Sequence, residues 1–114
     1  MDDYIMIKLS DFSKFPSGRD DNDGDFNGEK YRDSILAPQI KAAKASGKKI
    51  EISIEGVLNF GSSFLEEAFG GLVRKGIASK DDLKNLLRIT PNNDKYARYR
   101  SVILKHIEEA KADT

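Results

Sequence analysis

Ser62 and Ser63 are the side chains whose position in the chain most suggests chemistry. They follow the alternating apolar segment 50–55 and precede apolar residues at helical spacing over 64–73. A strand, a short loop and a helix are therefore expected, with both hydroxyls and the free backbone N–H groups of the helix start at one exposed point. Such a point can bind an anion or accept a phosphoryl group. It can equally be an ordinary helix cap, because Ser63 and Glu66 have the spacing of a capping box.

Weaker signals come from Arg19 and from the acidic loop around it. Arg19 follows a glycine and could clamp a phosphate with two hydrogen bonds, or it could pair with a neighbouring aspartate. The loop 19–25 is rich in Asp, Asn and Gly. Taking Gly24 as the sixth position of a calcium loop puts Arg19 first and Lys30 twelfth, where carboxylates are required. This spacing favours a solvated turn over a calcium site.

No catalytic group emerges from the remaining residues. Glu66 and Glu67 are adjacent, so on a helix they should point in different directions and form no acid–base pair. His106 has no cysteine and no Asp–His pair beside it, which is typical of a histidine at the surface or at the edge of a core rather than of a metal ligand. We therefore expect no enzymatic activity, no metal and no cofactor.

Length and charge restrict the class of protein further. A chain of 114 residues can bury one core, and we expect residues 1–114 to form a single domain. Lysine plus arginine balance aspartate plus glutamate at 19 each, which argues against a nucleic-acid partner, because polyanion binding needs a basic excess. No apolar run approaches ~18 residues, so no membrane partner is expected. The lack of cysteine and of a signal peptide favours the cytoplasm.

Alternating apolar residues predict a sheet with one buried face and one face at least partly in water. The segments 4–9 and 49–55 alternate in this way, and the short segment 88–90 could add a strand that ends at Pro91. The second segment should pack against the helix that follows it, through three isoleucines: Ile50, Ile52 and Ile54.

The longest helical patterns cover residues 29–46 and 63–75. Pro38 should kink or break the first of these helices. Gly70 and Gly71 lie inside the second helix, where each costs ~1 kcal/mol relative to alanine. We interpret this glycine pair as a face where another backbone approaches closely.

Shorter segments complete the expected architecture. Residues 11–28 predict a long loop, which is often functional in a compact domain. Three phenylalanines should pin this loop to the core: Phe12, Phe15 and Phe26. Ser79 opens a short helix with capping-box spacing, and a last helix should run from about residue 94 towards the C-terminus.

The segment Gly56–Leu65 resembles the signature of STAS domains, the fold of the anti-sigma-factor antagonists. In that signature a strand leads into Gly-Val, two further residues, an apolar residue, Asp-Ser-Ser-Gly-Leu and a helix. The residues that match in register are Gly56, Val57, Phe60, Ser62, Ser63 and Leu65. Gly61 stands where antagonists have aspartate, and Phe64 stands where they have glycine. The longer segment 60–74 resembles a STAS-like family of undefined function, with further similarity at 17–19 and 26–29.

The resemblance implies an α/β fold with a small mixed or mostly parallel sheet and helices mainly on one face. It also implies a bacterial regulatory module that binds a protein partner, such as a GHKL-type ATP-binding kinase, with Ser63 at the position that STAS antagonists phosphorylate. Phosphorylation would make the chain a substrate and switch in signal transduction, not a catalyst. The alternative is a sensor that binds a phosphate-bearing small molecule through Arg19 and the N–H groups of the serine loop.

Overall fold

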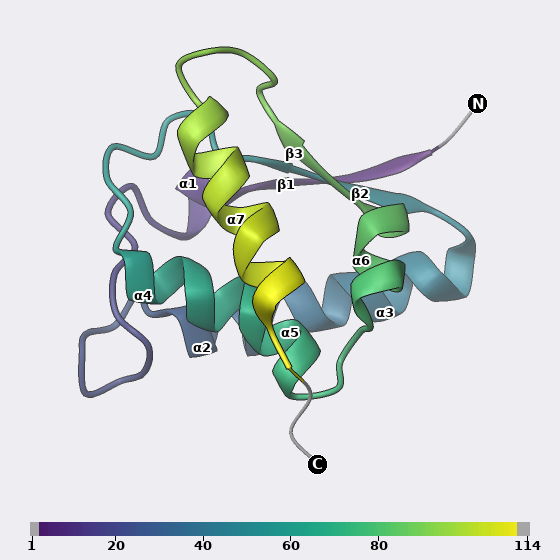
Figure 1. Cartoon of the computed structure of the whole chain (residues 1–114), viewed down its shortest axis with the longest axis horizontal. Helices are drawn as coiled ribbons and strands as arrows, with labels where there is room; N and C mark the ends of the chain where they lie inside the picture. Colours follow the sequence, from purple (N-terminus) through teal and green to yellow (C-terminus); the bar gives the residue numbers. More distant parts are fainter. Residues whose placement is uncertain (1–2, 112–114) are drawn as a thin grey trace.

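The computed structural model describes residues 3–111, which form a three-stranded sheet and a layer of helices (Figure 1). The strands are β1 (Tyr4–Lys8), β2 (Lys49–Ser53) and β3 (Leu87–Thr90). The helical segments are α1 (Leu9–Phe12), α2 (Gly28–Tyr31), η1 (Arg32–Leu36), α3 (Ala37–Ser46), α4 (Ser62–Leu65), η2 (Glu66–Gly70), α5 (Gly71–Arg74), α6 (Lys80–Leu86) and α7 (Ala97–Glu109).

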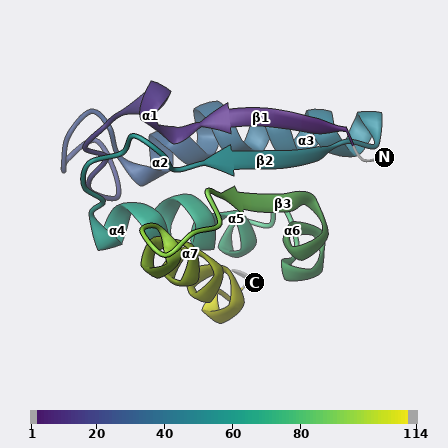
Figure 2. The same cartoon turned by 90° about the horizontal axis from the view of Figure 1, so that it is seen from above.

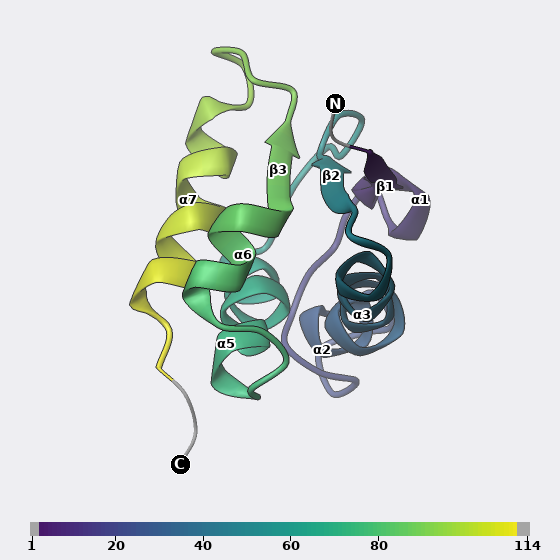
Figure 3. The ribbon, with the colours of Figure 1, turned by 90° about the vertical axis from the view of Figure 1, so that its right-hand side faces the viewer.

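The sheet is parallel, with β2 between β1 and β3 (Figure 2). Ile52 pairs with Ile7 on one side and with Ile89 on the other, so the inward-facing residues of all three strands lie in one row. Ile50, Ile52 and Ile54 are fully buried, which confirms the predicted orientation of this strand. Helices α2, α3 and α5 lie beneath the sheet, while α6 and α7 flank β3 (Figure 3).

The first long helix runs without a break from α2 through η1 to α3, so of the predicted kink or break at Pro38 the break does not occur. The segment η1 is a π-helical turn, in which the N–H of Ala37 donates to the carbonyl of Arg32 five residues earlier. This wider turn lies directly before Pro38, whose missing N–H and bulky ring would strain a regular α-helical turn. The helix ends as predicted at Gly47, which has a left-handed conformation with φ 69°.

The second long helix, α4–η2–α5, packs its backbone closely against its neighbours. A Cβ on Gly70 would lie 3.3 Å from the carbonyl oxygen of His106, and one on Gly71 would lie 2.7 Å from Nη1 of Arg32. The prediction that another backbone approaches closely is therefore confirmed at Gly70, whereas Gly71 meets the side chain of Arg32. Gly28 makes a closer backbone contact that the sequence did not reveal, since its Cβ would lie 2.7 Å from the carbonyl oxygen of Phe64.

The long loop is anchored less by its aromatic side chains than predicted. Phe12 packs edge-on against Phe26 and lies 5.0 Å from the ring of Tyr31, which joins it to the core. Phe15 and Phe26 are 62% and 51% exposed, so the expectation that both pin the loop to the core is wrong. Backbone hydrogen bonds fasten this loop instead, because residues 14–19 pair with residues 26–29 on one side and 58–61 on the other.

Candidate functional site

The serine loop connects the end of β2 to the start of α4. Gly61 is the N-cap residue in an extended conformation, and the helix begins at Ser62. No side chain caps this helix start, so the predicted capping box between Ser63 and Glu66 is wrong. Ser62 is exposed and Ser63 is half-buried. Within residues 3–111, neither hydroxyl has a hydrogen-bond partner, which leaves both available at the N-terminal end of a helix.

The carboxylate of Glu66 binds two arginines and does not cap the helix. Arg19 and Arg74 each hold an oxygen of Glu66, at 2.5 and 2.8 Å from their respective Nη1 atoms. The side chain is thereby directed along the helix and away from its start, where a capping box would need it.

The long loop occupies the space beside Gly61. The N–H of Gly61 donates to the carbonyl of Pro16 at 3.0 Å. A Cβ on Gly61 would lie 3.1 Å from the hydroxyl oxygen of Ser17 and 3.2 Å from its Cα. An aspartate, which STAS antagonists are expected to have here, would therefore require the loop to move. The close approach of the long loop therefore favours glycine at this position.

Three exposed apolar side chains lie on the segments that are hydrogen-bonded around the serines. Leu58 is 67% exposed, and its N–H donates to the carbonyl of Lys14 at 2.8 Å, next to Phe15. Phe26 is joined through its carbonyl to the N–H of Ser17 at 3.0 Å. We refer to Phe15, Phe26 and Leu58 as the serine-loop patch. Exposed apolar side chains on neighbouring segments are available for contacts with a partner.

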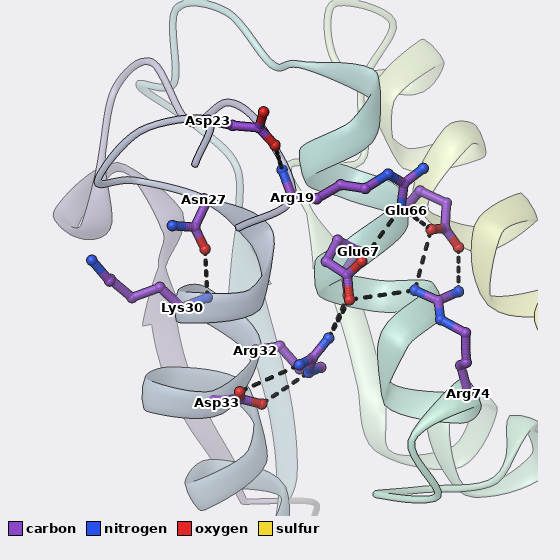
Figure 4. Close-up of polar contacts among 9 residues, drawn as sticks. All are labelled: Arg19, Asp23, Asn27, Lys30, Arg32, Asp33, Glu66, Glu67 and Arg74. Atoms are coloured by element: carbon purple, nitrogen blue, oxygen red, sulfur yellow. Dashed lines mark hydrogen bonds and ion pairs between the residues drawn. The ribbon is translucent and has the colours of Figure 1, made fainter. Parts of the chain in front are cut away.

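Arg19 reaches across to the second helix rather than to its own loop (Figure 4). Its guanidinium pairs with Glu66 at 2.5 Å and with Glu67 at 3.4 Å. The expectation that the side chain of Arg19 pairs with a neighbouring aspartate is therefore wrong. Asp23 instead accepts a hydrogen bond from the backbone N–H of Arg19 at 2.8 Å. The side chain of Arg19 remains 47% exposed, but two carboxylates already offset its charge.

Glu66 and Glu67 belong to one connected ion-pair network, because they share two arginine partners (Figure 4). Arg74 contacts Glu66 at 2.8 Å and Glu67 at 3.4 Å, and Arg19 also touches both. Arg32 pairs with Glu67 and, at 2.9 Å, with Asp33. Both glutamates lie in the π-helical turn η2, whose wider spacing differs from the regular α-helix assumed for the sequence.

Burial and ion pairing act in opposite directions on the carboxyl group of Glu66. Burial raises the pKa of Glu66, but hydrogen bonds and charges from Arg74 and Arg19 outweigh it and hold the pKa below its ordinary value. Glu66 is therefore charged at neutral pH. This network joins the long loop, the first helix and the second helix immediately behind the serines.

Arg32 and Arg74 are the members of this network that sequence reasoning missed. Arg32 is only 4% exposed. The one sequence feature that could have indicated its burial is its position next to Tyr31, which faces the core. Its partner Glu67 lies 35 residues away along the chain, so no local spacing could link the two. Arg74 was interpreted only as a favourable charge at a helix C-terminus.

The remaining candidates stay outside the site. In the acidic loop, Asp21 pairs with Lys30 at 3.2 Å, and Asp20 accepts from the N–H of Asn22 at 3.0 Å. No group of three or more metal-ligating side chains occurs among residues 3–111. His106 lies on α7 at the edge of the core, as predicted, with its Nε2 buried and without a partner in the described part of the chain.

This geometry defines a class of protein, namely a small α/β protein with a parallel sheet and a serine pair at the start of a helix. The family model of the STAS-like domain of unknown function (DUF4325) matches residues 27–97, and the chain belongs to this family. The match confirms the resemblance seen in the sequence, and it includes both serines and Arg32 but begins after Arg19. No curated protein and no solved structure matches the chain. Across residues 3–111, no helix is long and apolar enough to cross a membrane.

Proposed function

We propose that this chain is a regulatory protein-binding module whose serine loop is docked by a protein partner and phosphorylated on Ser62 or Ser63. The observation that carries the proposal is the pair of unpartnered hydroxyls at the start of α4. A structural cap would engage at least one of them with the backbone, and neither is engaged among the described residues. Their availability supports a role in contacts outside the chain.

The serine-loop patch supports a protein as the partner. Phe15 and Leu58 are 62% and 67% exposed on segments that are hydrogen-bonded to each other beside the helix start. Aromatic and aliphatic side chains of this kind supply the buried centre of protein interfaces. A partner that covers this patch reaches the hydroxyls of Ser62 and Ser63 at the same time.

A phosphate at this point would change the docking surface strongly. It adds about 1.5 to 2 negative charges at neutral pH, beside apolar side chains that a partner has to desolvate. The N-terminal end of the helix offsets part of that charge, so the fold tolerates it. The phosphorylated chain therefore keeps its structure and loses affinity for its partner.

The resemblance of the serine loop to that of the anti-sigma-factor antagonists favours a kinase as one such partner. This partner would be a GHKL-type ATP-binding kinase, and the chain would be its substrate rather than a catalyst. The alternative, a sensor with its phosphate site at Arg19, is less favoured because Glu66 and Glu67 already bind that guanidinium.

Affinity capture from the native cells tests this proposal with four proteins: wild type, Ser63→Asp, Leu58→Asp and Met6→Asp. We expect an ATP-binding protein to be captured by the wild type and reduced about tenfold or more in the Ser63 and Leu58 variants, because charge at the centre of an interface is costly. Met6 is the matched control, since it is 54% exposed but lies on the open face of the sheet.

The same partners in equal amounts with all four proteins would contradict the proposal. So would an equal loss with Met6→Asp, which would point to a general effect of added charge. Circular dichroism of each variant shows that the comparison is made between folded proteins.

A further inference from the structure

A cleft of about 450 Å³ lies at β3, on the side of the molecule where α6 and α7 flank this strand (Figure 3). Its walls carry four cations: Lys49, Lys84, Arg88 and Arg100. None of its lining residues among residues 3–111 carries a carboxylate. In a chain with zero net charge, this is a local concentration of positive charge. The volume is within the range of small-molecule sites.

Arg88 and Arg100 differ from the arginines of the ion-pair network because no carboxylate of residues 3–111 lies within 4 Å of either guanidinium. The nearby acidic side chains are directed elsewhere. Glu51, the cross-strand neighbour of Arg88, accepts a hydrogen bond from Thr90 at 3.3 Å. Glu108 pairs with Lys84 at 3.2 Å. Two guanidinium groups at the cleft are thus without an anionic partner.

Both arginines are held in position by neutral groups. Arg100 donates from Nε to the carbonyl oxygen of Ile89 at 3.0 Å, which leaves its terminal nitrogens for another acceptor. Arg88 lies over the ring of Tyr4, with its Cζ 5.8 Å from the ring centroid. Guanidinium groups fixed in this way lose less freedom on binding and offer paired N–H donors that match the oxygens of a phosphate.

We propose that this cleft is a binding site for a small phosphate-bearing ligand, held by Arg88 and Arg100. A ligand with two linked phosphates fits better than a single carboxylate, because two arginines with no carboxylate partner among residues 3–111 line the same cleft. Asn85 and Asn92 add neutral amide groups to the lining, which can bind the non-phosphate part of such a ligand. The lining of this cleft includes neither Ser62 nor Ser63.

Titration of the folded protein in a phosphate-free buffer tests this site, with inorganic phosphate, pyrophosphate, ADP and a glutamate-rich peptide as separate probes. We expect saturable binding of pyrophosphate that is tighter than that of phosphate, with NMR shifts concentrated in residues 85–89 and 100–104. Tighter binding of ADP than of pyrophosphate would show that the organic part is recognised as well, while equal affinities would identify the phosphates alone as the ligand.

Arg88→Gln should weaken pyrophosphate binding about tenfold or more, because it removes a charge-assisted hydrogen bond. The matched control is Arg98→Gln, since Arg98 is exposed on the same helix as Arg100 but outside the cleft. Arg88 is also exposed, so its replacement leaves the core intact. The proposal is overturned if no phosphate probe saturates, if both variants lose affinity equally, or if the glutamate-rich peptide binds more tightly than pyrophosphate.

Discussion

At the scale of single residues, the ion-pair network behind the serines separates buried charges from exposed ones. Arg32 is 4% exposed, whereas Arg19 is 47% exposed, yet both bind Glu67. A buried charge that loses its partner is costly, because it can no longer be hydrated. An exposed charge that loses its partner returns to water at little cost. The two arginines should therefore contribute very differently to the stability of the fold.

Replacement of each arginine by alanine measures this difference. We expect Arg32→Ala to lower the free energy of unfolding by roughly 1 to 3 kcal/mol, because it removes a nearly buried side chain and two ion pairs, while Glu67 keeps Arg19 and Arg74 as partners. Arg19→Ala should lower it by less than about 1 kcal/mol. Urea unfolding of both variants beside the wild type gives the two values, and similar losses would contradict the assignment of Arg32 as the buried member.

Glu66 should make the free energy of unfolding depend on pH in the acidic range. Its pKa is lowered in the folded state, so its contribution is fully present above the unfolded value of about 4.3 and is lost as the pH falls through the folded pKa. Glu66→Gln removes this contribution at every pH. The gap in melting temperature between wild type and variant should therefore narrow between pH 7 and about pH 3. A gap that is constant over this range would contradict the ion pairing of Glu66.

At the scale of elements, the helix starts show which local patterns can be trusted. Ser79 forms the capping box predicted for it, accepting from the N–H of Asp82 at 3.0 Å. Ser63 has the same spacing to Glu66 but forms no cap, because Gly61 is the N-cap residue and Ser63 lies inside the first turn of the helix. A distant ion pair does not by itself prevent a capping box, since Asp82 also binds Lys44 at 2.8 Å. The residue at which each helix begins decides the outcome, and the capping signature alone does not contain it.

The two serines give a direct comparison of capping energies. Ser79→Ala should cost about 1 kcal/mol of unfolding free energy, since it removes a cap hydrogen bond. Ser63→Ala should cost no more than a few tenths, because its hydroxyl makes no such bond within the described residues. Thermal or urea unfolding of both variants checks this order, and a larger loss for Ser63→Ala would restore the capping interpretation.

Contact between the two long helices depends on Gly28. A Cβ at this position would lie 2.7 Å from the carbonyl oxygen of Phe64 and 3.0 Å from the backbone nitrogen of Ala68. Gly28→Ala should therefore destabilise the protein by roughly 1 to 3 kcal/mol, because backbone atoms cannot yield as side-chain ends do. On an uncrowded helix the same change would stabilise by about 0.4 to 1 kcal/mol. An increase in unfolding free energy would contradict the close crossing.

At the scale of the whole molecule, periodicity was enough to predict the sheet and the position of both long helices. The alternation of Ile50, Ile52 and Ile54 correctly gave the buried face, and Gly47 correctly ended the first helix. The continuity of that helix through Pro38 was not predictable, because a π-helical turn has no local signature here. The candidate site likewise has a part that the sequence predicts and a part that it does not.

The serines could be located from their place between strand and helix, and the family match confirms the STAS-like resemblance around them. Their surroundings could not be predicted. The steric reason for Gly61, the exposure of Phe15 and the link from Arg19 to Glu66 all arise from the path of the long loop. That path is set by tertiary hydrogen bonds rather than by the composition of the loop.

The central claim is that the serine pair accepts a phosphoryl group, and mapping of phosphorylation sites on protein purified from its native cells tests it most directly. Trypsin cleaves after lysine and arginine, so both serines fall in the single fragment Ile50–Arg74. Fragment ions distinguish Ser62 and Ser63 from Ser53 in the same peptide. We predict phosphate on Ser62 or Ser63, lost in the Ser63→Ala or Ser62→Ala variant that removes the modified hydroxyl. Complete coverage of this peptide with no phosphate on either serine would contradict the claim.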